Sequence, residues 1–294
     1  MSLDAVKILE IFITINPKKE ILECIQKSLI TGAKKTVKIE KNASFTNKNL
    51  TIVTPNPEQI VFAGHDSHFK ELLNQADISL PDGVGVVWAS KFAHSSQVTV
   101  NSERILKAIP GIEFMEELVA IAAKQHVPVA LIGGRNGLAL KTFDCLSKTH
   151  PKLLGWAIDG PEARIQGSRL TVQSQNTNTD EYFQDLAKRI VDSGVQMVFV
   201  GLGAPKQEYF IERLRRWIPG QARDDKGVII FMSVGGSFDE ISGRISRPPQ
   251  WVSTLGLKWF WRLILEPWRI RRQLALVRFV WLVMKERYIP KKIK

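Results

Sequence analysis

Short apolar runs rich in β-branched residues alternate with stretches of helical periodicity along most of the chain. The apolar runs lie at residues 6–15, 50–54, 78–80, 127–132, 153–158, 195–200 and 228–234. Helical patterns stand between several of them, at 18–29, from Pro57 onward and at 83–92. Strands that alternate with helices favour a largely parallel sheet covered by helices. We therefore predict an α/β, Rossmann-like fold with a mostly parallel sheet.

Three of the predicted strands run directly into glycine-containing turns. These turns occupy residues 133–137, 201–203 and 235–236. In open α/β sheets, ligands bind beyond the carboxyl ends of the strands, where backbone amides and helix N-termini face anions. A single glycine does no more than close a tight turn, but three such turns after strands favour a nucleotide site. None of them matches the dinucleotide fingerprint with its downstream acid.

Polar side chains follow two further strands. Thr54 and Asn56 come directly after one of them, and Asp82 stands in a Pro-Asp-Gly turn after the next. A carboxylate held in a rigid turn suits a general base. Helix capping also selects Thr, Asn and Asp at such places, so each motif by itself leaves both explanations open.

The positive charge of the chain is concentrated at its C-terminal end. Residues 243–294 contain 13 Lys or Arg and two acids, so they carry +11 of the total of +12, and five of the eight tryptophans also lie there. A basic, Trp-rich helical segment is typical of attachment to an anionic membrane surface. A solvated basic face over ordinary core aromatics is the alternative. We predict an α/β domain over residues 1–242 and a basic, amphipathic helical appendage over 243–294.

Periodicity within this appendage predicts two functional faces. Spacings of seven and three residues bring Arg262, Arg269 and Arg272 near one another on a helical surface, provided that Pro267 does not break the helix. An apolar stripe with helical spacing comprises Ile270, Leu274, Val277, Trp281 and Met284. Lipid contact and ordinary packing on the core both explain such a stripe.

The sequence lacks the motifs of several common classes of enzyme. The sequence has no P-loop, no Gly-x-Ser-x-Gly elbow and no Cys or His pair at convincing metal spacing. Cys24 and Cys145 indicate buried thiols in a reducing compartment, and no secretory leader is evident. No run reaches the roughly 20 apolar residues that a membrane-spanning helix needs. An Asp-x-Asp motif for a diphosphate-bound metal is also missing, so we expect arginines to stabilise any diphosphate.

Six motifs occur in one order along the chain. They are Thr54-Pro-Asn-Pro-Glu58, Leu80-Pro-Asp-Gly-Val-Gly-Val86, Gly201-Leu-Gly-Ala-Pro-Lys-Gln-Glu208, Gly235-Gly-Ser-Phe-Asp239, Arg247-Pro-Pro-Gln-Trp251 and Leu257-Lys-Trp-Phe-Trp-Arg-Leu-Ile-Leu-Glu-Pro-Trp-Arg269. With them the chain resembles the WecG/TagA/CpsF glycosyltransferase family over about residues 6–287. The resemblance implies an inverting, metal-independent transferase that moves N-acetylmannosamine or its uronic acid from UDP to N-acetylglucosamine-diphospho-polyprenol. Its product would serve a surface polysaccharide or teichoic acid.

Matching the motifs residue by residue gives each position an implied role. Asp82 resembles the catalytic base of the family. The positions matching its substrate pocket are Thr54, Asn56, Gln207, Gly201, Gly203 and Gly235. Arg262, Arg269 and Arg272 match the arginines that close over the donor diphosphate.

Arg104 matches less well than these residues. Extra residues separate it from Gly111, and Glu113 stands where the family has Asp. Insertions at 33–49 and 220–227 also depart from the family pattern and could change oligomer contacts.

The resemblance also implies a cytoplasmic enzyme, peripheral on the inner face of the cytoplasmic membrane. Its partners would be a UDP-sugar donor, a polyprenyl-diphosphate-linked acceptor and the anionic membrane surface, with no nucleic acid, no cofactor and no metal. A homo-oligomer is left open. Two alternatives are a non-catalytic basic protein that binds membranes or nucleic acid, and another α/β nucleotide enzyme such as a dehydrogenase. The first of these leaves Asp82 and the glycine turns unexplained.

Overall fold

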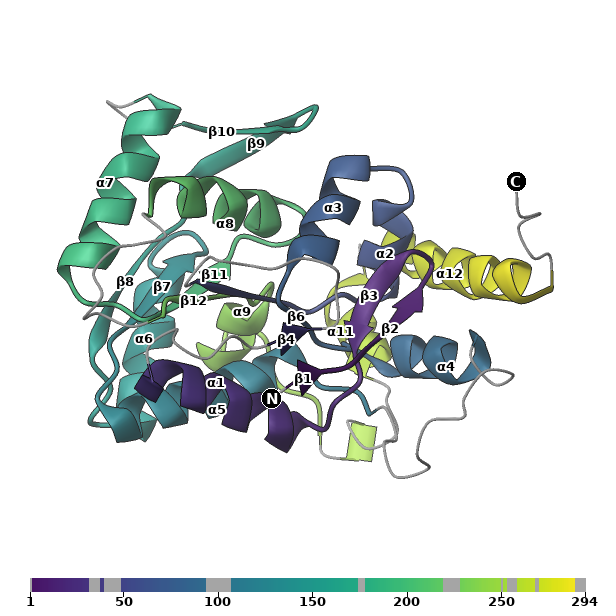
Figure 1. The fold of residues 1–294 in the computed structure, drawn as a ribbon, viewed down its shortest axis with the longest axis horizontal. Coiled ribbons are helices and arrows are strands. Elements are labelled where there is room, and N and C mark those ends of the chain that lie inside the picture. The colour runs from purple at the N-terminus through teal and green to yellow at the C-terminus, as the bar shows by residue number, and fades with distance from the viewer. Residues whose placement is uncertain are drawn as a thin grey trace.

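The computed structural model describes residues 2–31, 38–39, 49–93, 107–173, 178–218, 228–249, 251–252, 258–267 and 270–288. Its centre is a parallel six-stranded sheet with the order β6-β5-β12-β11-β7-β8 (Figure 1). The strands are β5 (Leu50–Val53), β6 (Ile78–Ser79), β7 (Val129–Gly133), β8 (Gly155–Ile158), β11 (Met197–Gly201) and β12 (Ile230–Ser233). Each of them coincides with a predicted apolar run, so the predicted α/β, Rossmann-like fold is confirmed.

Helices bury both faces of this sheet. Consecutive strand residues point to opposite faces, and accordingly Ile52 and Val53 lie in two different core clusters. The cluster of Ile52 includes side chains of α1 (Lys18–Thr31), α5 (Gly111–Gln125) and α6 (Leu138–Thr149). The cluster of Val53 includes side chains of α2 (Pro57–Ala63), α3 (Ser67–Gln75), α7 (Thr179–Asp192) and α8 (Lys206–Trp217). The predicted helices at 18–29, from Pro57 and at 83–92 correspond to α1, α2 and α4 (Val84–Ala93), so these predictions are confirmed.

The prediction of one strand over residues 6–15 is wrong, because this segment forms a hairpin. β2 (Ala5–Ile8) and β3 (Ile11–Thr14) pair antiparallel around Leu9 and Glu10, whose φ angles are 46° and 71°. A two-residue hairpin turn of this kind requires positive φ angles at both central residues, and Asn and Gly adopt such angles most readily. The hairpin lies beside the edge strand β6, where the Ser79 amide donates a 3.0 Å hydrogen bond to Thr14 Oγ1.

Two smaller strand pairs lie outside the central sheet. β9 (Glu162–Gln166) and β10 (Arg169–Gln173) form an antiparallel hairpin that is not among the predicted elements, although buried and exposed residues alternate along β10. β1 (Ser2–Leu3) pairs with β4 (Lys38–Ile39). Of the predicted insertion at 33–49, only β4 and Asn49 lie within the described residues. The insertion at 220–227 lies outside them.

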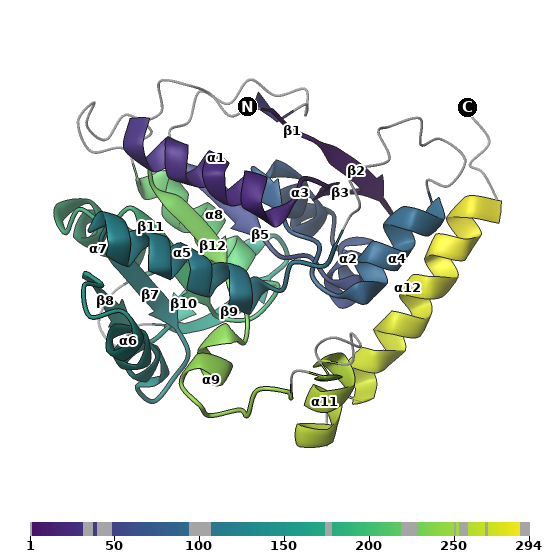
Figure 2. The same ribbon diagram turned by 90° about the horizontal axis from the view of Figure 1, so that it is seen from below.

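The C-terminal part of the chain forms α9 (Ser237–Ile241), α11 (Lys258–Leu265) and α12 (Ile270–Tyr288). Figure 2 shows α12 beside α4, and α11 on the same side of the molecule as α9. Phe279 and Val283 of α12 are fully buried in the same cluster as Ile60 of α2. Within the described ranges, no helix combines the length and the apolar character that crossing a bilayer requires.

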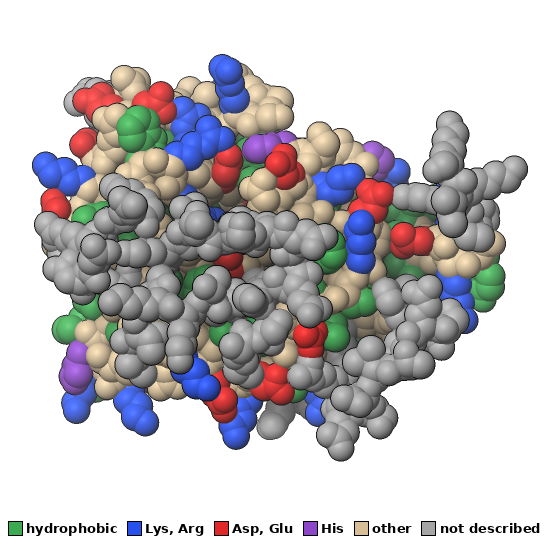
Figure 3. All heavy atoms as spheres, in the orientation of Figure 1, with side chains coloured by type: hydrophobic (Ala, Val, Ile, Leu, Met, Phe, Trp, Pro, Cys, Tyr) green, Lys and Arg blue, Asp and Glu red, His purple; other side chains and the backbone are tan. Residues whose placement is uncertain are grey.

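The predicted apolar stripe of α12 faces away from the core. Figure 3 shows hydrophobic side chains at the surface over α12, with basic side chains close by. The five stripe residues are 41% to 70% exposed, and they are Ile270, Leu274, Val277, Trp281 and Met284. Ordinary core packing therefore does not explain the stripe in this structure.

Candidate active site

A cavity of about 1430 Å³ lies at the carboxyl ends of the central strands. The predicted site residues that line it are Thr54, Asn56, Asp82, Gly201, Gly203, Gln207, Gly235 and Arg262. They lie at or after the ends of β5, β6, β11 and β12 or belong to α8 and α11, so distant parts of the chain meet here. Arg104 and Arg269 lie outside the described residues, and the side chain of Arg272 in α12 is likewise not described.

The turn that carries Asp82 is tied to the turn after the neighbouring strand. The Asp82 amide donates a 3.2 Å hydrogen bond to the carbonyl of Pro55, and the Ile109 amide donates one of 2.9 Å to the carbonyl of Pro81. Gly83 follows with a φ of +90°, a conformation that favours glycine. These bonds fix the half-buried Asp82 beside the segment that contains Thr54 and Asn56.

The first turn of α5 packs directly on Thr54. A Cβ atom on Gly111 would lie 3.1 Å from Thr54 Cγ2, which is closer than side chains normally approach. Asn56 caps α2, because its side-chain oxygen accepts a 3.0 Å hydrogen bond from the Gln59 amide. The capping explanation is thus correct for Asn56, although this residue also lines the cavity.

Two of the glycine turns are in direct backbone contact. The Gly134 amide donates a 3.0 Å hydrogen bond to the carbonyl oxygen of Gly201. A Cβ atom on Gly133, where φ is +144°, would lie only 2.4 Å from that oxygen. Glycine is required here because the ends of β7 and β11 approach too closely for any side chain.

Gln207 connects the loop after β11 to the turn after β12. Its side-chain oxygen accepts a 2.9 Å hydrogen bond from the Gly235 amide, and its side-chain nitrogen donates one of 2.9 Å to Glu208 Oε1. Gln207 and Glu208 are both buried. Both ends of the Gln207 amide therefore bind protein groups, and this residue holds the Gly235 turn in place.

Burial raises the pKa of Glu208 to about 7, although the hydrogen bond from Gln207 acts in the opposite direction. A carboxyl group that takes up and releases its proton near neutral pH thus lies next to two of the glycine turns. Glu208 belongs to the motif at 201–208, but its position in that motif predicts no role for it.

Glu208→Gln is expected to remove a pH dependence from the free energy of unfolding. The folded protein holds a proton on Glu208 at pH values where the unfolded chain, with the ordinary pKa of 4.5, has released it. The wild type should therefore lose up to about 3 kcal/mol of stability as the pH rises between these two pKa values. Urea unfolding at about pH 5 and about pH 8 measures this. Parallel pH profiles for variant and wild type would contradict the assignment.

Arg262 projects from α11 onto the turn after β12. A Cβ atom on Gly236 would lie 3.0 Å from Nη2 of Arg262 and 3.1 Å from Nη1. Nε and Nη2 are buried without a hydrogen-bond acceptor among the described residues. A buried guanidinium with unused N–H groups is suited to bind an anion at the cavity.

Other lining residues gave no signal in the sequence. An apolar wall comes from α2, α4 and α12 and contains Phe62, Trp88, Leu276 and Val280, and Glu240 adds a carboxylate from α9. The helical spacing of Leu276 and Val280 could have marked a second face of α12. Within the described ranges, no three His, Cys, Asp or Glu side chains gather as a metal ion would require.

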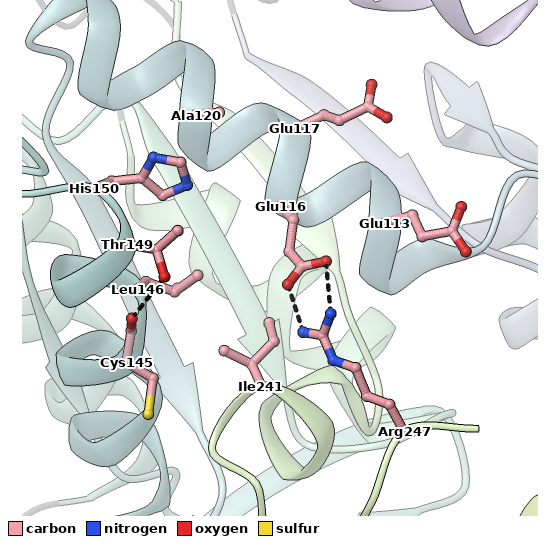
Figure 4. Close-up of a pocket in the computed structure, with 10 residues that line it drawn as sticks. All are labelled: Glu113, Glu116, Glu117, Ala120, Cys145, Leu146, Thr149, His150, Ile241 and Arg247. Carbon is pink, nitrogen blue, oxygen red and sulfur yellow. Dashed lines mark hydrogen bonds and ion pairs between the residues drawn. The ribbon is translucent and has the colours of Figure 1, made fainter. Parts of the chain in front are cut away.

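A second cavity, of about 470 Å³, lies between α5, α6 and α9. Figure 4 shows Arg247 reaching Glu116 there through two hydrogen bonds. None of the predicted site residues lines this cavity. Cys145 does so and is only partly buried, so the prediction that both cysteines are buried is correct for Cys24 alone.

Comparison with known proteins identifies the family of the chain. The model of the glycosyl transferase WecG/TagA/CpsF family matches residues 28–293. The chain is also similar to the N-acetylglucosaminyldiphosphoundecaprenol N-acetyl-beta-D-mannosaminyltransferase of Bacillus subtilis (strain 168). The two are 32% identical over 251 residues, which cover 84% of each chain. Together with the five of the six ordered motifs that contribute residues to the larger cavity, these findings show that the chain is a glycosyltransferase of the WecG/TagA/CpsF family.

Proposed function

We propose that this enzyme transfers N-acetylmannosamine, or its uronic acid, from UDP to N-acetylglucosamine-diphospho-polyprenol with inversion of configuration. The observation that carries the proposal is the meeting of Asp82, Thr54 and Arg262 in one cavity. The printed activity of the Bacillus subtilis relative supports the sugar and the acceptor. The positions of the glycine turns support a nucleotide diphosphate as the donor.

In this proposal the transfer is a single displacement at the anomeric carbon of the donor sugar. Asp82 accepts the proton of the acceptor hydroxyl while its oxygen forms the new bond to that carbon. The bond from the same carbon to the diphosphate oxygen breaks, and UDP leaves with the electron pair. Attack from the face opposite the leaving group inverts the configuration.

Arginine side chains take the place of a metal ion in this scheme. Negative charge grows on the departing diphosphate, and the unused N–H groups of Arg262 are suited to bind it. We include Arg269 and Arg272 in the same role because they match arginines of the family motif. Their helical spacing from Arg262 does not support it, since α11 ends at Leu265 and α12 begins at Ile270. Gln207 acts indirectly, because it holds the Gly235 turn on which Arg262 lies.

One experiment tests donor, acceptor and metal independence together. The protein is incubated with a panel of UDP-sugars and a short-chain N-acetylglucosamine diphospholipid, with a chelator present, and the product is identified by mass. We expect a product heavier by one N-acetylhexosamine or its uronic acid, with the N-acetylmannosamine type preferred. Activity that appears only after a divalent metal is added would refute the metal-independent scheme.

We further propose that α12 attaches the enzyme to the inner face of the cytoplasmic membrane. Its exposed apolar stripe includes Val277 and Trp281, and Arg278 and Lys285 are exposed on the same helix. Such a helix suits the headgroup region of an anionic bilayer.

Co-sedimentation with anionic vesicles tests this attachment. The wild type should bind, and a variant carrying Val277→Ser and Trp281→Ser should bind about tenfold more weakly because it buries less apolar surface. A DNA duplex serves as the control for charge alone. Unchanged vesicle binding by the double variant, or tighter binding to the duplex, would refute the attachment.

A further inference from the structure

Arg262 is paired with carboxylates from two different elements. Nη1 lies 3.6 Å from Glu240 Oε1 of α9, and Nε lies 3.7 Å from Glu266 Oε2 at the end of α11. The three side chains are 22%, 15% and 14% exposed, in the order Arg262, Glu240 and Glu266. Glu266 follows Arg262 by four residues, so that pair lies within one segment. The pair with Glu240 joins α11 to the helix that follows β12.

These ion pairs do not use up the hydrogen-bonding capacity of the Arg262 guanidinium. Both are longer than a normal hydrogen bond, and Nε and Nη2 keep their N–H groups without an acceptor among the described residues. The guanidinium also lies over the backbone of Gly236. The carboxylates therefore hold the cation beside the cavity that Arg262 lines, without forming normal hydrogen bonds to it.

We infer that Glu240 is a positioning residue, which holds Arg262 over the Gly235-Gly236 turn before the donor arrives. The inference rests on the proposed function, since it takes Arg262 as a ligand of the donor diphosphate. An arginine side chain has high rotamer entropy, and a partner that orders it in advance reduces the cost of binding. Because Glu240 is mostly buried, its attraction to Arg262 is screened less than that of a surface pair.

A carboxylate near a diphosphate site also acts in the opposite direction, by repelling the donor. Here Arg262 lies against Glu240 and offsets its charge, so the repulsion that reaches the donor is reduced. The two effects change the KM for the donor in opposite directions. Positioning predicts a higher KM when the charge of Glu240 is removed, and repulsion predicts a lower one.

Glu240→Gln tests the inference, with Glu116→Gln as the matched control. Glu116 also pairs with an arginine of the C-terminal part, Arg247, but in the smaller cavity (Figure 4). We expect Glu240→Gln to raise the KM for the UDP-sugar about fivefold and to change kcat less than about twofold, from the upper range of exposed ion-pair strengths. Glu116→Gln should change neither. In an Arg262→Gln background, Glu240→Gln should have no further effect on this KM.

Hydrogen exchange in the ligand-free protein gives a second readout that needs no activity. Backbone amides of α11 should exchange faster in Glu240→Gln than in the wild type and in Glu116→Gln. An unchanged or lower donor KM, effects that add in the double variant, or unchanged exchange would each overturn the inference. If Arg262→Gln leaves kcat/KM for the donor unchanged, the proposed role of Arg262 is wrong. The exchange result then still decides whether Glu240 holds α11.

Discussion

Asp82→Asn is expected to lower kcat by about 10²- to 10⁴-fold, the range that general-base catalysis contributes. Asparagine has nearly the same shape as aspartate but cannot accept the proton of the acceptor hydroxyl. The backbone bonds that fix the turn, from the Asp82 amide to Pro55 and from the Ile109 amide to Pro81, do not involve the carboxylate. Binding of the UDP-sugar, measured by titration calorimetry, should therefore stay within about threefold of the wild type.

Asp159→Asn is the matched control for this variant. Asp159 follows β8 at the same edge of the sheet, and its carboxylate accepts hydrogen bonds from the Gly137 and Ala139 amides at the start of α6. It does not line the larger cavity. Because asparagine also caps helices well, this control should keep its turnover. Near-normal turnover by Asp82→Asn, or an equal loss in both variants, would remove Asp82 from the role of base.

Arg262→Gln should lower kcat/KM by about 10²-fold or more, as removal of a preorganised charged donor does. Glutamine removes the charge that offsets the leaving diphosphate, and it leaves Glu240 and Glu266 without this partner at the cavity. Arg262→Lys keeps the charge but loses the planar donor set, so its activity should be intermediate. Steady-state kinetics with the UDP-sugar varied at saturating acceptor measures both variants.

A point substitution isolates this role better than removal of residues 243–294. Phe279 and Val283 are buried in the main core, so a truncated chain would lose packing as well as the arginine. Arg287→Gln provides the control, because Arg287 donates to the carbonyl of Phe92 and does not line the cavity. Activity of Arg262→Gln within about threefold of the wild type would refute the diphosphate role.

The central sheet was predictable from sequence, while the N-terminal hairpin was not. Buried parallel strands produce continuous apolar runs, and glycine turns mark their ends, so both features are visible without contacts. In the hairpin, Leu9 and Glu10 adopt positive φ angles that their side chains disfavour. Tertiary packing of Ile8 and Ile11 in the core overrides this local preference, and local patterns carry no record of it.

The site also has some features that the sequence predicts and others that it does not. Asp82 and Thr54 could be found because strand ends bring them to one edge. Arg262 could be found from the motifs, whereas its helical spacing to Arg269 and Arg272 assumed a continuous helix that in fact ends at Leu265. The pairing of Arg262 with Glu240 depends on how α11 lies against α9, which no spacing along the chain reveals. The exposure of the α12 stripe likewise became visible only when the burial of Phe279 and Val283 showed which face meets the core.

The N-terminal hairpin bears on how this enzyme should be produced and handled. It covers the outer strand whose last residues lead into the Asp82 turn, and Thr14 accepts a hydrogen bond from the Ser79 amide of that strand. A version trimmed at its N-terminus past Thr14 would present an open strand edge to other molecules, which invites self-association and precipitation. Purification tags should therefore extend the N-terminus rather than replace any of it.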